Sequence, residues 1–172
     1  MERNEVVLVD EQDNPLAVIE KLAAHEKGLL HRAFSIFLFN ENGELLLQQR
    51  AENKYHGAGL WTNACCSHPQ WNEDVKVAAI ERLAYEMGMT CELDYVFSFI
   101  YHTAVENDLI EHEYDHVFVG YTNTNPTPNP AEVQNYKWVN PESLLLDIHE
   151  NPAKYTFWFR TAINEVLSAI QK

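Results

Sequence analysis

Residues 61–69 place a thiol and an imidazole two positions apart, directly before a stretch that predicts a helix. Cys66 can donate or accept a proton, and His68 can bind a metal ion. The helix carries Arg82 and Glu86, which are four residues apart and therefore share one face. Such a carboxylate and guanidinium can together hold a metal-bound phosphate. The sequence thus brings groups for proton transfer, metal binding and phosphate binding close to one another.

Two further carboxylates, Glu111 and Glu113, lie within residues 110–121, which predict a β-strand. Side chains alternate along a strand, so both carboxylates face the same way and His112 faces the other. Two carboxylates about 7 Å apart repel each other unless a cation or protons lie between them. An exposed, solvated edge strand is the alternative explanation of this motif taken alone.

Three histidines offer imidazole ligands. His25 and His31 are too far apart for one helical turn, so only a bend at Gly28 would bring them together. With His68 they make three imidazoles, to which the strand 110–121 adds two carboxylates. This donor set suits Zn²⁺, Mn²⁺ or Fe²⁺ better than Ca²⁺, which prefers a cage of oxygen ligands.

The elements that must position these residues are mixed in type. Asn40-Glu-Asn-Gly predicts a hairpin turn, Gly88 the end of a helix, and Pro141 the first turn of another. The expected strands cover residues 6–9, 16–19, 33–39, 44–49, 93–102, 110–121 and 136–139, and the helices cover 73–87, a stretch from 140 and a stretch from about 152. Because strands and helices do not alternate regularly, we expect an α+β fold in which helices sandwich a mixed sheet.

The length and composition are those of an ordinary globular protein. The 172 residues predict one domain, 1–172, and 46% hydrophobic with 22% charged residues excludes a disordered chain. A net charge of −14 makes a nucleic-acid surface improbable. We find no signal-peptide pattern and no run of about 18 apolar residues for a membrane span. Three cysteines, two of them adjacent, are a poor disulfide framework, so we expect a cytoplasmic protein with reduced thiols.

The motifs resemble those of the Nudix family, in the variant form of the type I isopentenyl-diphosphate isomerases. The Nudix box reads Gly-x5-Glu-x7-Arg-Glu-aliphatic-x-Glu-Glu-x-Gly-aliphatic, and the chain matches it at Glu73, Leu83, Glu86, Gly88 and Met89. It departs from the box where Ser67 replaces Gly, Glu81 and Arg82 replace Arg-Glu, and Tyr85 replaces a Glu. Two carboxylates that bind metals in hydrolases are missing, which argues against a pyrophosphohydrolase.

The resemblance implies a Nudix-like fold and two ion sites. The isomerase contexts Lys-x-x-x-His, His-x-Ala-Phe-Ser, Cys-x-His-Pro and Glu-x-Glu all occur here. They assign a second divalent ion, Mn²⁺ or Zn²⁺, to His25, His31, His68, Glu111 and Glu113. They assign Mg²⁺, bound with the substrate diphosphate, to Glu86 with water and the Cys66 carbonyl. The remaining phosphate charge would be neutralised by Lys21, Arg50, Lys54 and Arg82.

The reaction implied is the 1,3-allylic rearrangement of isopentenyl diphosphate to dimethylallyl diphosphate, in isoprenoid biosynthesis. An alkene is a poor base, so its protonation needs a strong, positioned acid shielded from water. We assign protonation to Glu113, assisted by the Tyr101 hydroxyl, and deprotonation to Cys66, although the opposite assignment is equally reasonable. Trp158 would offer a π face to the carbocation-like intermediate. The neighbouring Cys65 falls outside the motif and should be dispensable.

Other readings of these motifs remain open at the level of sequence. Arg82 and Glu86 could be an ordinary surface ion pair, residues 50–54 a solvated turn, and Trp158 a core aromatic. The chain could be a Nudix hydrolase of a nucleoside diphosphate derivative. It could also be a non-catalytic module in which Cys65, Cys66, His68 and another histidine hold structural Zn²⁺. The sequence does not distinguish a monomer from a homodimer.

Overall fold

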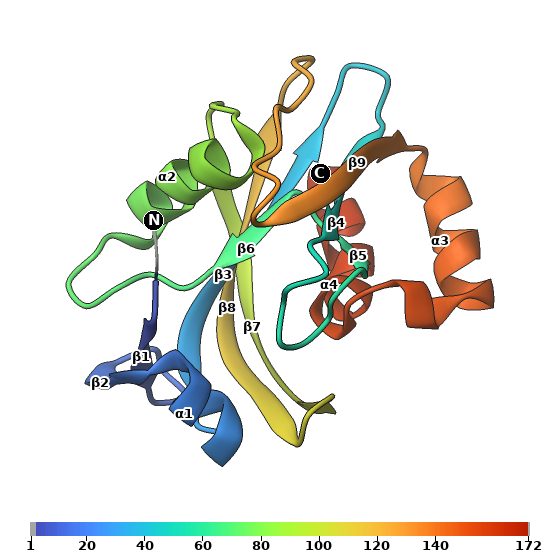
Figure 1. Cartoon of the computed structure of the whole chain (residues 1–172). Coiled ribbons are helices and arrows are strands. Elements are labelled where there is room, and N and C mark those ends of the chain that lie inside the picture. Colours follow the sequence, from blue (N-terminus) through green and yellow to red (C-terminus); the bar gives the residue numbers. More distant parts are fainter. Residues whose placement is uncertain (1–2, 172) are drawn as a thin grey trace.

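The computed structural model describes residues 3–171 and is built around a nine-stranded mixed sheet (Figure 1). The strands are β1 (Glu5–Val9), β2 (Pro15–Glu20), β3 (His31–Phe39), β4 (Leu45–Arg50), β5 (Trp61–Thr62), β6 (Cys65–Ser67), β7 (Asp94–Val105), β8 (Leu109–Tyr121) and β9 (Val133–Val139). The helices are α1 (Lys21–Lys27), α2 (Val75–Met87), α3 (Pro141–Glu150) and α4 (Phe157–Ile170), with a 3₁₀ turn at Pro152–Lys154. The expected α+β architecture is therefore confirmed.

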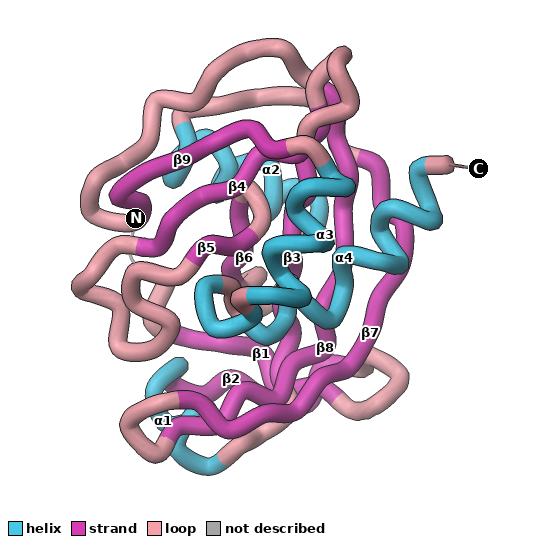
Figure 2. The backbone as a smooth tube through the Cα atoms, turned by 90° about the vertical axis from the view of Figure 1, so that its right-hand side faces the viewer, coloured by secondary structure: helices cyan, strands magenta, loops and turns pink. Residues whose placement is uncertain are grey.

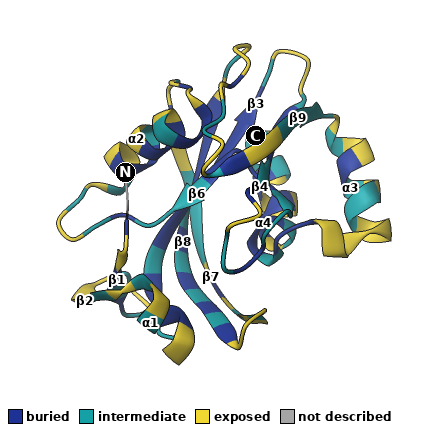
Figure 3. Ribbon diagram, in the orientation of Figure 1, coloured by how far each residue is buried: buried dark blue, intermediate teal, exposed yellow. Residues whose placement is uncertain are grey.

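The strand β3 is the centre of the sheet and is buried along most of its length (Figure 3). It pairs in parallel with β8 over its whole length, from His31 opposite Glu113 to Phe39 opposite Tyr121. By contrast, β3 meets β4 only at Phe39 and Leu45, so the two strands splay apart beyond this pair. The short strands fill the opening, since β6 pairs with β3 and β5 pairs with β4. This opening is where the functional side chains gather.

Alternation along β3 sends its apolar side chains to both faces of the sheet. Phe34, Ile36 and Leu38 pack in a cluster with the apolar side of α2. Phe37 and Phe39 pack in a second cluster with α4 and α3. In Figure 2, α3 and α4 lie in front of the sheet and α2 lies behind it. The helices thus sandwich the sheet as expected.

The helix α1 was not predicted from the sequence. The Glu20 carboxylate caps it by accepting hydrogen bonds from the backbone amides of Leu22 and Ala23. It ends at Gly28, whose φ of 66° lies in the left-handed region that glycine tolerates. The bend expected at Gly28 is present, and it turns the chain from α1 directly into β3.

Other boundaries differ by a few residues from those expected. The helix expected from 73 begins at Val75, because the Asp74 side chain caps it by accepting from the backbone amide of Val77. The final helix begins at Phe157 rather than near 152, since Pro152 starts a 3₁₀ turn. The last strand starts at Val133 instead of 136. None of the helices described within residues 3–171 is long and apolar enough to cross a membrane.

Candidate active site

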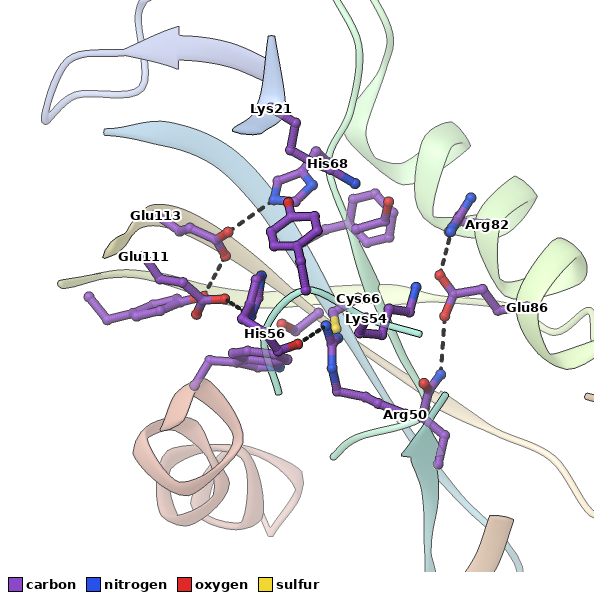
Figure 4. Close-up of a pocket in the computed structure, with 17 residues that line it drawn as sticks. Lys21, Arg50, Lys54, His56, Cys66, His68, Arg82, Glu86, Glu111 and Glu113 are labelled. Atoms are coloured by element: carbon purple, nitrogen blue, oxygen red, sulfur yellow. Dashed lines mark hydrogen bonds and ion pairs between the residues drawn. The ribbon is translucent and has the colours of Figure 1, made fainter. Parts of the chain in front are cut away.

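One pocket at the opening between β3 and β4 is lined by every predicted site residue except His25 and His31. Those two histidines are fully buried immediately behind it. In the close-up of Figure 4, Glu111, Glu113 and His68 lie on one side of the pocket and Arg82 and Glu86 on the other. Cys66, Lys54 and Arg50 lie between the two groups. The structure therefore brings the predicted residues into a single site.

The carboxylates lie on β8. Every second side chain of this strand faces the same way, and this face is apolar in the core and acidic where it reaches the pocket. Val117 and Val119 pack under α4, and Asp115, Glu113 and Glu111 continue the same face of the strand. His112 points the other way, as expected, and its Nδ1 lies 3.1 Å from the Gly28 carbonyl. A solvated edge strand is thus wrong for this motif, because both glutamates are buried inside the pocket.

Four of the predicted ligands converge on one point. The ligand atoms of His25, His31, His68 and Glu113 all lie within 4.8 Å of one another. Glu113 Oε2 lies 3.1 Å from His31 Nε2 and 2.9 Å from His68 Nε2. The Nδ1 atoms of His25 and His31 bond to the carbonyls of Lys21 and Leu29, at 2.8 Å and 2.9 Å. Each of these two rings therefore turns its Nε2 inward, as histidine ligands of metals do.

The donor set fits a divalent ion. Among the described residues, His25 Nε2 is buried without a hydrogen-bond partner, which a metal ion would supply. Burial lowers the pKa of His25 and lowers that of His68 to about 3, so both rings are neutral and able to ligate. Burial also acts on His31, but the Glu113 carboxylate outweighs it and raises the pKa of His31. His31 and His68 hold the pKa of Glu113 well below its usual range against the effect of burial.

Glu111 belongs to an overlapping group with a residue that the sequence analysis missed. His56 Nδ1 lies 3.0 Å from Glu111 Oε1, and His25, His56 and Glu111 form a second group of candidate ligands. The Tyr101 hydroxyl donates to Glu111 at 3.2 Å and to Glu113 at 2.5 Å. Tyr101 is therefore placed beside Glu113, as predicted. His56 lies in an irregular segment, where no periodicity could have marked it.

The adjacent cysteines separate because β6 sends them to opposite faces. Cys65 is fully buried in the cluster beneath α2, whereas Cys66 lines the pocket opposite Ser35 of β3. Burial raises the pKa of the Cys66 thiol, which keeps it protonated near neutral pH. The indole of Trp158 donates to Asn63 Oδ1 at 3.2 Å and lines the same pocket. Trp158 is thus both a core aromatic and a wall of the site.

The phosphate-binding candidates form a charged cluster at the other end of the pocket. Arg82 Nε donates to Glu86 Oε2 at 2.6 Å, and the two residues are only 7% and 5% exposed. An ordinary surface ion pair is therefore wrong for them. Glu132 accepts from Arg82 at 2.9 Å and also contacts the Lys54 ammonium. Glu132 was not identified from the sequence, since it follows a proline-rich loop without a recognisable motif.

Lys21 and Arg50 complete the four predicted cations. Burial lowers the pKa of Lys21, with further lowering by nearby cations including Lys54. The Arg50 guanidinium lies 5.3 Å from the Trp158 ring centre and donates to the carbonyls of His56 and Gly57. These contacts hold Arg50 at the pocket wall. The segment 50–54 does contain a turn that is exposed at Glu52 and Asn53, but its two ends, Arg50 and Lys54, line the pocket.

A third carboxylate on β8 was also missed. Asp115 is buried, accepts a hydrogen bond from the Ser35 hydroxyl at 2.8 Å, and has a pKa raised by burial and by Glu113. It continues the Glu-x-Glu alternation by one more step, which is the signal that could have found it. Burial therefore favours the neutral form of the Asp115 carboxyl.

Comparison with known proteins gives consistent matches. The family model described as NUDIX domain matches residues 29–159. Isopentenyl-diphosphate Delta-isomerase 2 of Photorhabdus laumondii is 54% identical over 159 residues, covering 92% of this chain and 90% of the relative. Isopentenyl-diphosphate Delta-isomerase of Serratia proteamaculans is 48% identical over 161 residues, covering 94% and 90%.

Solved structures agree on the fold. DR0079 from Deinococcus radiodurans superposes with a TM-score of 0.78 at 18% identity, covering 94% of this chain and 98% of that one. The MutT protein from Methanosarcina mazei superposes with a TM-score of 0.69 at 21% identity, covering 83% and 96%. At these identities the two structures establish the fold alone.

Proposed function

The chain belongs to the isopentenyl-diphosphate Delta-isomerase family of Nudix domain proteins, and from this premise we propose how its pocket works. It interconverts isopentenyl diphosphate and dimethylallyl diphosphate in isoprenoid biosynthesis, by moving protons and breaking no phosphate bond. The observation that carries the proposal is that two proton-transfer groups, Cys66 and Glu113, line one pocket with a cluster of cations.

The diphosphate binds at the end of the pocket that carries the cations. Lys21, Arg50, Lys54 and Arg82 line the pocket and supply positive charge to it, and Lys21 is half-buried while Arg82 is buried. Charge-assisted hydrogen bonds from such groups to phosphate oxygens are stronger than neutral ones. Glu86 is the residue that would hold a Mg²⁺ ion arriving with the diphosphate, since a carboxylate and phosphate oxygens are the ligands this ion prefers. The substrate is thereby oriented with its alkene toward Cys66 and Glu113.

The second divalent ion, Mn²⁺ or Zn²⁺, would be held by His25, His31, His68, Glu111 and Glu113. We call these five residues the metal cage. When bound, such an ion withdraws electron density from Glu113, so that its protonated form is a stronger acid. The chain's own residues supply the rest of the acid's environment. The Tyr101 hydroxyl lies 2.5 Å from Glu113 Oε1 and can stabilise either protonation state of the carboxyl.

The isomerisation needs one proton delivered and one removed. In the forward direction the alkene's terminal carbon takes a proton, and the carbon two positions away loses one, which leaves the double bond between the other pair of carbons. We assign the two roles to Glu113 with Tyr101 and to Cys66. Because the free protein has a protonated Cys66 thiol and an ionised Glu113 carboxylate, delivery by Glu113 and removal by Cys66 requires a prior proton transfer between them, whereas the opposite assignment does not. The reverse reaction exchanges the roles. The tertiary cation formed in between would face the Trp158 ring, an attraction of about 2 kcal/mol when water is excluded.

The two alternative functions, a Nudix hydrolase and a structural zinc module, have less support from the site. A hydrolase would use the carboxylates of a complete Nudix box, but Tyr85 replaces one of them and lies against Arg82, 4.7 Å from the guanidinium carbon to the ring centre. A structural zinc module would need cysteine ligands, yet the candidate metal groups found among residues 3–171 contain no cysteine. Cys65 in particular faces the core, away from the histidines.

The proposed activity also indicates where the protein acts and what it binds. We propose that it acts in the cytoplasm on a free, small-molecule diphosphate, with neither nucleic acid nor membrane as a partner. A net charge of −14 opposes binding to other polyanions, while the converging cations permit one small anion.

The direct test is product analysis with purified protein, Mg²⁺ and Mn²⁺. Isopentenyl diphosphate should be converted to dimethylallyl diphosphate without release of phosphate, and nucleoside diphosphate derivatives should remain intact. The Cys66→Ala protein is the matched control, because it retains the phosphate site and lacks one proton-transfer group. Release of phosphate from either substrate, with the alkene unchanged, would contradict the proposal and favour a hydrolase.

A further inference from the structure

His56 lies against the metal cage although it comes from none of the elements that supply the other ligands. It belongs to the irregular segment 51–60 and is only 8% exposed. Its ring centre lies 5.2 Å from that of His25, and its Nδ1 lies 3.0 Å from Glu111 Oε1. His56 is thus a buried polar side chain on an irregular segment, next to two candidate metal ligands. Its burial beside these residues suggests a role in the metal site.

The two groups of candidate ligands cannot hold an ion each. One group contains His25, His31, His68 and Glu113, and the other contains His25, His56 and Glu111. His25 belongs to both, but its Nδ1 is bonded to the Lys21 carbonyl at 2.8 Å. Only Nε2 of His25 remains for an ion, so His25 can serve one ion, and a second ion would be left with only His56 and Glu111 of its group. A single ion shared by both groups uses every one of these donors.

We propose that His56 is a sixth protein ligand of that single ion, together with His25, His31, His68, Glu111 and Glu113. The inference rests on the metal cage of the proposed function and extends its ligand set. Six donors, four of them imidazoles, suit an octahedral ion such as Mn²⁺ or Fe²⁺ better than Zn²⁺, which usually takes four ligands. With six protein donors the ion has no coordinated water.

This ligand would connect the cage to the diphosphate site. The carbonyl of His56 accepts a hydrogen bond from Arg50 at 3.0 Å, and Lys54 lies two residues before it in the same segment. The β7–β8 turn secures the segment, because Glu106 accepts from the Gly57 amide at 3.0 Å and Asn107 donates to the Tyr55 carbonyl at 2.7 Å. An ion bound by His56 would therefore fix two of the phosphate-binding cations in place.

The test is titration of metal-free protein with Mn²⁺ in the absence of diphosphate, followed by calorimetry and by the relaxation rate of water protons. The wild type should bind one Mn²⁺ with low relaxivity, because no water is coordinated. His56→Ala should still bind one ion, more than about tenfold more weakly, with increased relaxivity from a newly coordinated water. His102→Ala, which removes an exposed histidine stacked on His112 on the outer face of the sheet, should match the wild type. Circular dichroism of the metal-free variants verifies that each is folded.

Each contrary result has a distinct meaning. If the wild type binds no Mn²⁺, the cage itself is wrong and the sixth ligand falls with it. If the wild type binds one ion and His56→Ala leaves relaxivity unchanged, the cage stands and the sixth ligand is wrong. This includes the case in which affinity falls at constant relaxivity, since His56 would then only hydrogen-bond Glu111. Binding of two ions by the wild type would overturn the argument that His25 is shared. His56→Gln repeats the comparison with a side chain of similar size.

Discussion

Single residues acquire their roles here from the strand face to which they belong. Cys65 and Cys66 are chemically identical neighbours, yet one is sealed beneath α2 and the other lines the pocket. The same alternation turns Glu111 and Glu113 inward and His112 outward. Strand parity alone therefore decides which of these groups can reach a substrate.

The cysteines provide an internal comparison. Cys66→Ala should lower kcat by about 10²–10⁴-fold, the usual contribution of a positioned proton-transfer group. Cys65→Ser should stay near wild-type turnover, since its side chain packs in the core and does not line the pocket. Steady-state kinetics of both variants tests this. The assignment is wrong if Cys65→Ser abolishes turnover while Cys66→Ala retains it.

Among His25, His31 and His68, metal affinity should depend on pH through His31 alone. The pKa of His31 is raised above 6.5, whereas that of His25 is lowered and that of His68 is about 3. At pH 6.5 the incoming ion must therefore displace a proton from His31 and from neither of the others. Affinity should fall as pH drops through the raised pKa of His31, by about tenfold per pH unit for one displaced proton.

Calorimetry in buffers of different ionisation enthalpy counts the released protons. In the His56→Ala protein, whose remaining histidine ligands are His25, His31 and His68, we expect about one proton per Mn²⁺ at pH 6.5 and fewer at pH 8. Release of two or three protons at pH 6.5 would mean that His25 and His68 are also charged before binding, contrary to their burial. His102→Ala is again the control, because its exposed imidazole is outside the cage.

At the scale of elements, the site exists because β3 and β4 diverge. The two strands share a single pair of residues, and the opening beyond it exposes the inner face of β8. Glu132, immediately before β9, joins Lys54 of the segment 51–60 to Arg82 of α2. It contacts both cations without lining the pocket itself. Glu132 therefore holds Lys54 and Arg82 in position from outside the pocket lining.

Removing that carboxylate should weaken substrate binding selectively. Glu132→Gln should raise KM about tenfold, the effect of one charge-assisted hydrogen bond, and leave kcat nearly unchanged. Glu92→Gln is the control, since Glu92 pairs with Lys76 at the surface. Loss of a negative charge would by itself favour phosphate binding. A lower KM for Glu132→Gln would therefore show that charge, and not positioning, determines its effect.

The elements with strong local signals were predictable. The hairpin at Asn40, the helix ended by Gly88 and the alternating strand 110–121 were all expected, because turn residues and periodicity encode them locally. α1 was missed, since it has only seven residues and its cap is a glutamate instead of the more usual short polar residue. The irregular segment 51–60 has no periodicity, so its ordered contacts with the cage could not be read from it.

The site residues were predictable by resemblance, whereas their convergence was not. His31 and Glu113 are 82 positions apart, and only the parallel pairing of β3 with β8 brings them together. His56 and Glu132 were missed for the same reason. Their significance depends on which side chain packs opposite them, and that is a property of the folded chain.

In the molecule as a whole, the residues that stabilise the fold are different from the residues that would bind the metal ion. Two apolar clusters, one under α2 and one under α4, hold the sheet from both faces. The metal cage links α1, β3, β8 and the residue that follows β6, and His25, His31, His68 and Glu113 belong to neither apolar cluster. The fold should therefore persist when the ion is removed.

Thermal unfolding measures this separation. A concentration of Mn²⁺ one hundred times its Kd should stabilise the protein by about 2.7 kcal/mol and raise Tm by about 5–10 °C. Treatment with a chelator should reverse the shift and leave a protein that still unfolds cooperatively well above room temperature. A metal-free protein that is unfolded at room temperature would contradict this account and support a structural role for the ion.

The central claim is that Cys66 and Glu113 exchange protons with an alkene, and proton NMR in D₂O tests it most directly. Isopentenyl diphosphate incubated with the protein, Mg²⁺ and Mn²⁺ should yield dimethylallyl diphosphate that has gained deuterium, because both groups exchange their protons with solvent. Glu113→Gln and Cys66→Ala should each abolish this conversion. Formation of dimethylallyl diphosphate without deuterium would contradict proton transfer through these groups, and an unchanged alkene with liberated phosphate would contradict isomerisation itself.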